Sequence, residues 1–170
     1  GIYDTGGGKV IGDPDLIPAN IRQGKSIFGI SGNIEIPNKP IFLCGGYSPI
    51  SWETRYNGEP SLSFSQDDEG LLFPYFSLVG TAIGICSTLP VDLTDYSNLK
   101  FCAYNYSGYQ LILGVCTAEQ RDTVSFTASI NTSTSGSFNG SVDISGLTGS
   151  YYLKIHSTSR PHRVYSIFLH

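Results

Sequence analysis

The chain has 170 residues, which suits one ordinary domain with an appendage and allows a self-sufficient hydrophobic core. Only 14% of the residues are charged and the net charge is −4, without any cluster of lysine or arginine, which argues against a nucleic-acid partner. No apolar run approaches the roughly 20 residues of a membrane-spanning helix, so we expect no membrane insertion. The sequence contains no methionine, and we therefore expect a processed chain or a fragment of a longer one.

Residues 1–40 predict a Gly-rich lead-in and a small connector. Pro18 occupies the position that helices favour for their first residue, and Gly24 can end a helix in the left-handed conformation, which predicts one short helix over residues 18–23. A short hairpin should follow, with its turn at residues 31–33. The connector is too small to bury its own apolar side chains, so we expect them to pack against the following domain or another copy of the chain. These side chains are Ile21, Ile27, Phe28 and Ile30.

Short apolar runs separated by Gly, Pro, Ser and Thr dominate the chain from about residue 41 onward. Their spacing is close to the roughly 8–12 residues expected of an all-β sandwich, and no stretch has the helical period of about 3.6 residues. We therefore predict an all-β, jelly-roll-like sandwich over residues 41–170, after the connector of residues 1–40. The predicted strands are 41–46, 61–65, 71–79, 82–87, 98–105, 110–117, 123–130, 137–145, 150–157 and 163–169, and residues 131–140 are predicted to form a long polar connection.

A short motif occurs twice in this region, as VDLT in residues 91–94 and as VDIS in residues 142–145. In a strand its two apolar side chains point into the core, while the acidic side chain points outward and can cap the next turn. Asp92 and Asp143 are therefore predicted to cap turns rather than to form a catalytic carboxylate pair. A second alternation, in residues 111–115, predicts that the odd-numbered side chains face the core.

The four cysteines, Cys44, Cys86, Cys102 and Cys116, have no C-x-x-C spacing. Three of them lie in apolar, strand-like runs, which favours small buried side chains with free thiols. The alternative is two disulfides in an exported protein. Free thiols are the favoured interpretation because disulfide-stabilised domains are usually shorter and richer in cysteine.

The sequence offers little catalytic or metal-binding chemistry. No histidine has metal-ligand spacing to a second ligand, and His156 is expected to face solvent on its strand. Arg160, His162 and Arg163 are expected to form a solvated hairpin tip. The acidic run at residues 67–69 could contribute to a calcium loop, but it lacks the alternation of ligands and fits a solvated turn better. We expect no enzymatic activity, no metal and no cofactor.

Aromatic residues are the most promising candidates for a ligand site, since the chain has 11 Tyr, 9 Phe and 1 Trp. Tyrosine and tryptophan rings can stack on sugar rings while hydroxyl and amide groups form hydrogen bonds around them. Residues 105–110, NYSGYQ, form the best candidate for an exposed recognition loop. The alternative is that these rings fill the sandwich and subunit interfaces. The candidate ligand-binding residues are Trp52, Tyr56, Tyr104, Asn105, Tyr106 and Tyr109.

Two segments resemble parts of known proteins. Residues 16–32, LIPANIRQGKSIFGISG, resemble a short element of tail and fibre proteins of tailed bacteriophages and prophages: Asn-Ile, a polar pair, Gly, then Ile-Phe-Gly-Ile and Ser-Gly. Ser26 departs from that pattern, in which a β-branched residue is common. The second half, from Val91 to the end, is similar to the jelly-roll domains that end many such proteins and that look like carbohydrate-binding modules.

This resemblance implies a non-enzymatic, receptor-binding type of virion protein that is homotrimeric and contacts other tail proteins. It would assemble in the cytoplasm of the host bacterium and act outside it, where the distal sandwich contacts host-surface glycan. Three weak sites would gain affinity through their high effective concentration. Two alternatives remain open: a purely structural decoration or tail-assembly protein, and a carbohydrate-binding module of a secreted polysaccharide-active enzyme.

Overall fold

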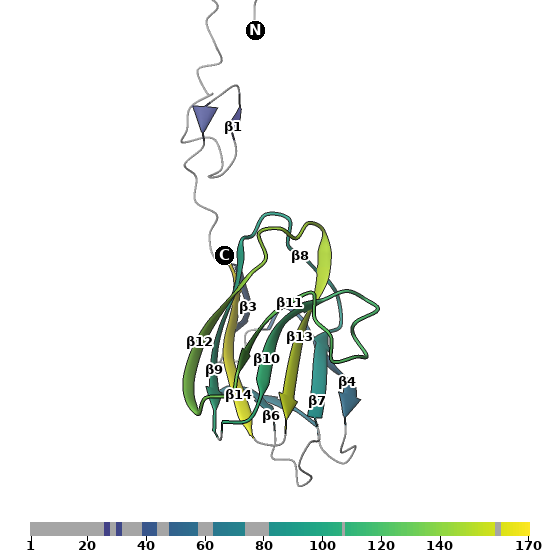
Figure 1. Ribbon diagram of the computed structural model, residues 1–170, viewed down its shortest axis with the longest axis vertical. Coiled ribbons are helices and arrows are strands. Elements are labelled where there is room, and N and C mark those ends of the chain that lie inside the picture. Colours follow the sequence, from purple (N-terminus) through teal and green to yellow (C-terminus); the bar gives the residue numbers. More distant parts are fainter. Residues whose placement is uncertain are drawn as a thin grey trace, which may run out of the picture. The chain divides into compact units, whose positions relative to one another are not determined.

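Figure 1 shows the computed structural model, which describes residues 26–27, 30–31, 39–43, 48–57, 63–73, 82–106, 108–158 and 161–170. The chain divides into two units, residues 1–37 and residues 38–170. In the first unit, β1 (Ser26–Ile27) pairs with β2 (Ile30–Ser31) as a two-stranded hairpin. The predicted helix over residues 18–23 lies outside the described residues. The hairpin turn predicted at residues 31–33 is wrong at Ser31, which lies in β2 and pairs with Ser26. The ranges that the structure describes contain no helix that is long and apolar enough to cross a membrane.

Two antiparallel sheets form the second unit, and this confirms the predicted all-β sandwich. The β13 sheet has the strand order β4-β7-β13-β10-β11, and β8 also pairs with β13. The β14 sheet has the order β5-β6-β14-β9-β12, and β3 also pairs with β14. Figure 1 shows β12, β9 and β14 in one layer and β10, β13 and β7 in the other.

The strands of the β13 sheet are β4 (Trp52–Asn57), β7 (Ala82–Ser87), β8 (Val91–Asp92), β10 (Leu111–Cys116), β11 (Ala128–Thr132) and β13 (Ser150–Thr158). The strands of the β14 sheet are β3 (Lys39–Leu43), β5 (Ser65–Asp67), β6 (Gly70–Phe73), β9 (Asn98–Asn105), β12 (Gly136–Asp143) and β14 (His162–Leu169).

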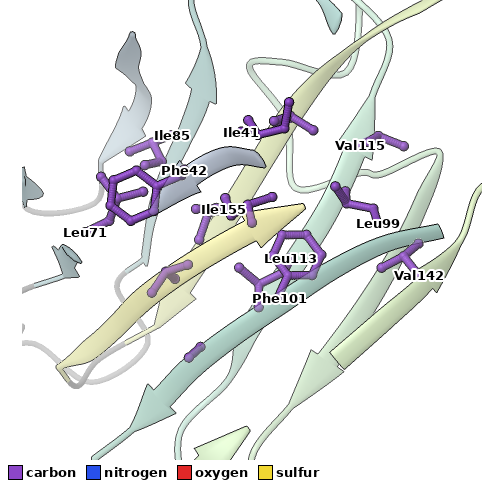
Figure 2. Close-up of a cluster of buried hydrophobic side chains, with 14 of the residues drawn as sticks. Ile41, Phe42, Leu71, Ile85, Leu99, Phe101, Leu113, Val115, Val142 and Ile155 are labelled. Carbon is purple, nitrogen blue, oxygen red and sulfur yellow. The ribbon is translucent and has the colours of Figure 1, made fainter. Parts of the chain in front are cut away.

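The core lies between the two sheets, and in strands such as β9 and β10 alternate side chains point into it. In β10 the odd-numbered residues Leu111, Leu113 and Val115 are fully buried, as predicted. Figure 2 shows Leu113 and Ile155 of the β13 sheet in the same cluster as apolar side chains of the β14 sheet. Each fully buried side chain of this size contributes roughly 1.5–3 kcal/mol through burial of apolar surface. This alternation also leaves two outer faces, one on each sheet.

The repeated motif caps its turns in the predicted way. The backbone N–H and hydroxyl of Thr94 donate to Oδ1 of Asp92 at 3.0 and 2.6 Å. The same groups of Ser145 donate to Oδ1 of Asp143 at 2.9 and 2.7 Å. In both motifs the hydroxyl and N–H donors lower the pKa of the acidic side chain below its usual value. Leu147 packs against the core after the second copy.

The structure differs from several strand predictions for this unit. The strand predicted over residues 123–130 begins only at Ala128, and the strand predicted over residues 61–65 is found instead at Ser65–Asp67. Residues 52–57 were not predicted as a strand, because polar residues interrupt the alternation and the register shifts between Thr54 and Tyr56. The long polar connection predicted for residues 131–140 is instead the end of β11 and the beginning of β12. Only residues 133–135 separate these strands, which belong to different sheets.

Candidate functional site

The loop of residues 117–127 covers part of the outer face of the β13 sheet. Lys154 points to that face from the middle of β13, and its side chain is 0% exposed. Its ammonium group donates to the carbonyl oxygens of Gln120 at 2.6 Å and Ser125 at 3.0 Å, and also to that of Thr123. Burial lowers the pKa of Lys154, but three carbonyl acceptors match its three N–H donors and stabilise the charged form. The covering loop is therefore attached to the sheet through a saturated buried cation.

Ion pairs attach the same loop at the edge of the sheet. Arg121 pairs with Glu53 of β4, and its guanidinium carbon lies 4.0 Å from the centre of the Tyr152 ring. Arg55 donates to both carboxylate oxygens of Asp122, at 2.8 and 3.0 Å. The hydrogen bonds from Arg55 lower the pKa of Asp122. The cations of this face, Lys154, Arg55 and Arg121, therefore all have partners within the protein itself.

His156 is buried beside this covered region, and the expectation that it faces solvent is wrong. It is 5% exposed, and its Nδ1 lies 2.7 Å from the hydroxyl of Tyr56. Burial and the nearby charge of Lys154 lower the pKa of His156 to about 4. The imidazole is therefore neutral at physiological pH and shares a hydrogen bond with the hydroxyl of Tyr56, whose own pKa is raised by burial.

Cys86 and Cys116 lie on the same outer face, on the two strands that flank β13. The hydrogen bond between the two thiols and their burial raise the pKa of Cys86, and the same hydrogen bond lowers the pKa of Cys116. Strands two positions apart in a sheet are separated by about 9–10 Å, which exceeds the Cα distance of about 7 Å that a disulfide can bridge. Cys86, Cys102 and Cys116 have free thiols.

The outer face of the β14 sheet carries a cluster of three tyrosines. Leu99, Phe101 and Ala103 of β9 are in the core, so the alternation places Tyr104 on the opposite face. The ring of Tyr106 packs 4.6 Å from that of Tyr104, centroid to centroid, and Tyr106 is 51% exposed. Burial and the neighbouring Tyr106 raise the pKa of Tyr165 of β14, so Tyr165 lies beside Tyr106. We call Tyr104, Tyr106 and Tyr165 the tyrosine cluster.

Asn105 holds the loop that presents Tyr106. Its side chain is fully buried and donates from Nδ2 to the carbonyl of Tyr109 at 2.6 Å. Its Oδ1 accepts from the backbone N–H of Gly108 at 2.9 Å. The buried His162 also contacts this loop: its Nε2 lies 3.2 Å from the Tyr109 carbonyl, and its Nδ1 lies 2.7 Å from the hydroxyl of Ser157. Because a carbonyl only accepts, Nε2 carries the proton, and the loop is fixed from the core side.

An open depression of about 340 Å³ continues this face along β9, β12 and β14. Its volume lies at the lower end of the range of roughly 300–1,000 Å³ for ligand pockets. Cys102 lies in it, two residues before Tyr104 on the same face of β9, so the depression adjoins the tyrosine cluster. The depression is lined by Lys100, Phe101, Cys102, Asn139, Gly140, Ser141, Ser166 and Phe168.

Arg163 supports the other side of the tyrosine cluster, and the prediction of a solvated hairpin tip is wrong for it and for His162. Arg163 is 8% exposed and His162 is 0% exposed. Nη1 of Arg163 lies 2.7 Å from Asp67 and 3.0 Å from Glu69, in the turn between β5 and β6. Partial desolvation raises the pKa of Asp67. Hydrogen bonds from Arg163 and from the Glu69 N–H outweigh this effect, so the pKa lies below its usual value. The acidic turn thus neutralises the buried guanidinium of Arg163. In the described part of the chain, no group of three potential metal ligands occurs.

The six predicted site residues do not form one site. Tyr104 and Tyr106 lie in the tyrosine cluster, and Asn105 and Tyr109 belong to the loop that positions it. Trp52 packs against the hydrophobic core from the β13 sheet, where Tyr56 bonds to His156. Sequence reasoning missed Tyr165, Lys100 and Phe168. Alternation could have identified the outward positions of Lys100 and Phe168, but not that of Tyr165, because the register of β14 against β9 shifts between Val164 and Ser166.

In the connector, the side chain of Ile27 is 45% exposed and that of Ile30 is half-buried. Ile21 and Phe28 lie outside the described residues. The oligomeric packing expected for these four apolar residues remains a prediction.

No protein-family model matches the sequence, and no curated protein matches it. Among solved structures, a variant of a family 29 carbohydrate-binding module superposes with a TM-score of 0.52 and 8% identity, over 79% of this chain and 92% of that one. A second variant, in complex with mannohexaose, gives a TM-score of 0.52 and 8% identity over 80% and 92% of the two chains. A third gives 0.50 and 10% identity over 78% and 90%. The sandwich therefore shares its fold with carbohydrate-binding modules.

Proposed function

We propose that this chain is a non-catalytic glycan-binding protein that uses the outer face of the β14 sheet. The observation that carries the proposal is the tyrosine cluster beside an open, mainly apolar depression whose lining includes the polar side chains of Asn139, Ser141 and Ser166. Tyrosine rings bind the C–H faces of sugars, and the neighbouring polar groups of Asn139, Ser141 and Ser166 can bind sugar hydroxyls.

The two outer faces support this choice of surface. Lys154, Cys86 and Cys116 on the β13 sheet are fully buried beneath the covering loop, so they are not accessible to a ligand. Tyr106 is half-exposed and its loop is fixed by buried Asn105, which reduces the entropy lost on binding. The shared fold adds support, since one of the similar structures contains mannohexaose.

The setting that we propose is a tail fibre or related receptor-binding protein of a virion, in which three copies bind a host glycan multivalently. It rests on the resemblance of residues 16–32 to phage tail and fibre proteins. Ile27, 45% exposed in its hairpin, is available for packing between copies. Light scattering at micromolar concentration tests the trimer: three chain masses are expected, and a monomer would contradict it.

A second setting is the carbohydrate-binding module of a polysaccharide-active enzyme, which the shared fold favours. The full reading frame distinguishes the two. Other tail proteins encoded beside it would support the virion setting, whereas a catalytic domain in the same frame would support the enzyme setting.

The glycan-binding proposal is tested with a panel of neutral and acidic oligosaccharides that includes mannohexaose. Tyr106→Ala should weaken binding about tenfold, which is the usual effect of removing a central aromatic anchor. Because Tyr106 is half-exposed, its free energy of unfolding should change little. Leu89→Ala is the matched control, since Leu89 is 70% exposed and lies between β7 and β8, away from the cluster. A folded chain that binds no member of the panel would overturn the proposal.

A further inference from the structure

We propose that the depression binds the carboxylate of an acidic sugar at Lys100, so that the ligand is an anionic rather than a neutral glycan. This inference rests on the proposed glycan binding and names the class of ligand. Two observations carry it: the charge balance of the described cations and the composition of the lining.

Most described cations are compensated within the protein. Arg55, Arg121 and Arg163 pair with carboxylates, and Lys154 is bonded to three carbonyl oxygens. Lys100 is exposed, and within the ranges described here it forms no ion pair. A cation left uncompensated at a depression attracts an anion, and its effect is strongest where a low-dielectric wall lies close by.

Among the described residues that line the depression, none carries a carboxylate that would neutralise this charge or repel an anion. Its polar lining residues other than Lys100 are the neutral Asn139, Ser141, Ser166 and Cys102. Lys100 is directly opposite Ser141 on β12 and Phe168 on β14, so an ammonium, a hydroxyl and an aromatic ring border the same small area. A sugar ring on Phe168 would thus place an acidic substituent within reach of Lys100 and its hydroxyls near Ser141.

The tyrosine cluster extends the same surface. Lys100 and Tyr104 are four residues apart on one face of β9, a distance of about 13 Å along the strand. Arg163, which lies beside the cluster, is already balanced by Asp67 and Glu69. Among the described cations of this face, Lys100 is therefore the one that can bind an anionic group of the ligand. The tyrosines would bind a neighbouring sugar.

The test compares acidic oligosaccharides with matched neutral ones by calorimetry: trigalacturonate with its methyl ester, and sialyllactose with lactose. At least one acid should bind about five- to tenfold more tightly than its neutral counterpart, which is the range for one hydrogen-bonded charge at a partly exposed site. The preference should decrease as the ionic strength rises. Lys100→Ala should abolish the preference by weakening the binding of the acid about five- to tenfold more than that of its neutral partner. Lys39→Ala, at another exposed lysine, should leave the preference intact.

Three results would overturn the inference. They are equal binding of both members in each pair, equal weakening of both by Lys100→Ala, and displacement of the acid by sodium acetate at matched carboxylate concentration and ionic strength. The last result would mean that any carboxylate binds there, whether or not a sugar carries it. Failure of this inference is distinguishable from failure of the proposed function, because neutral glycans would still bind in a manner sensitive to Tyr106→Ala.

Discussion

The outer faces of the two sheets differ in how they use their polar side chains. On the β13 sheet, Lys154 and His156 are buried and hydrogen-bonded, and the loop of residues 117–127 covers them. On the β14 sheet, Tyr106 and Lys100 are exposed, and an open depression lies between β12 and β14. Both faces are products of the same strand alternation, but one is stabilised by its own chain and the other is open to a ligand.

Because one outer face is covered and the other is open, stability and ligand binding should depend on different residues. Substitutions on the covered face should lower the free energy of unfolding without changing the affinity of the folded protein. Substitutions in the tyrosine cluster should do the reverse, because exposed side chains contribute little to stability. The predictions below test this separation.

Lys154→Met should have the largest effect on stability. Methionine retains much of the apolar stem but leaves the carbonyls of Gln120, Thr123 and Ser125 without their shared donor. Because buried acceptors without partners are costly, we expect a loss of about 4 kcal/mol in the free energy of unfolding, measured in urea. Glycan affinity at a temperature where the variant is folded should be unchanged.

The control is Lys39→Ala at the exposed start of β3, which should stay within about 0.5 kcal/mol of the unsubstituted chain. If Lys154→Met cost no more than this control, the loop would not depend on the buried ammonium.

The second prediction concerns pH and His156. Its pKa is about 4 in the folded protein and 6.5 in the absence of burial, so below pH 6.5 the unfolded chain binds a proton that the folded chain does not. Stability from this group is complete above pH 6.5 and is lost as the pH falls towards 4, by up to about 3 kcal/mol at about 1.4 kcal/mol per pH unit. His156→Asn should remove this slope from urea titrations between pH 6.5 and 4.

Other histidines contribute equally to both proteins, so the difference between the two slopes belongs to His156. Acidic groups such as Asp67 and Asp122, whose pKa values are lowered, affect stability mainly below this range. Parallel slopes for the two proteins would show that His156 can take up a proton without cost.

The sequence predicted the sandwich well where one face of a strand meets the core. Leu111, Leu113 and Val115 and the capping residues Asp92 and Asp143 follow directly from alternation and turn chemistry. Such features depend on neighbours in the chain, so local patterns are sufficient to identify them.

Outer-face features were harder to predict because they depend on distant residues. His156 is buried because Tyr56, 100 residues earlier in the chain, bonds to it from β4, a strand that the alternation did not reveal. For the candidate site, residues 105–110 were identified from their turn-like composition. Tyr165 was missed because only the pairing of β14 with β9 brings it beside Tyr106.

Gly70 tests how far the open face depends on the turn that carries Asp67. Gly70 has φ of 137°, and an added Cβ would lie 2.4 Å from the carbonyl oxygen of Val164. Gly70→Ala should cost roughly 2–3 kcal/mol, because strain and a backbone clash add. Gly136→Ala is the matched control: its φ is 115° but nothing lies within 4 Å of the added Cβ, so only strain of about 1–2 kcal/mol should remain. Equal losses in urea titrations would rule out the clash with Val164.

Tyr165→Phe should have the smallest effect on both glycan affinity and stability. It keeps the aromatic ring and removes the hydroxyl that interacts with Tyr106. If the pairing fixes Tyr106 for binding, affinity should fall about threefold, which corresponds to about 0.6 kcal/mol for a hydrogen bond near solvent. The free energy of unfolding should change by no more than about 0.5 kcal/mol.

Calorimetry with Tyr106→Ala and the double variant completes the cycle: once the Tyr106 ring is absent, removal of the Tyr165 hydroxyl should have no further effect on glycan affinity. An additive loss would mean that the Tyr165 hydroxyl contacts the glycan directly instead of orienting its neighbour.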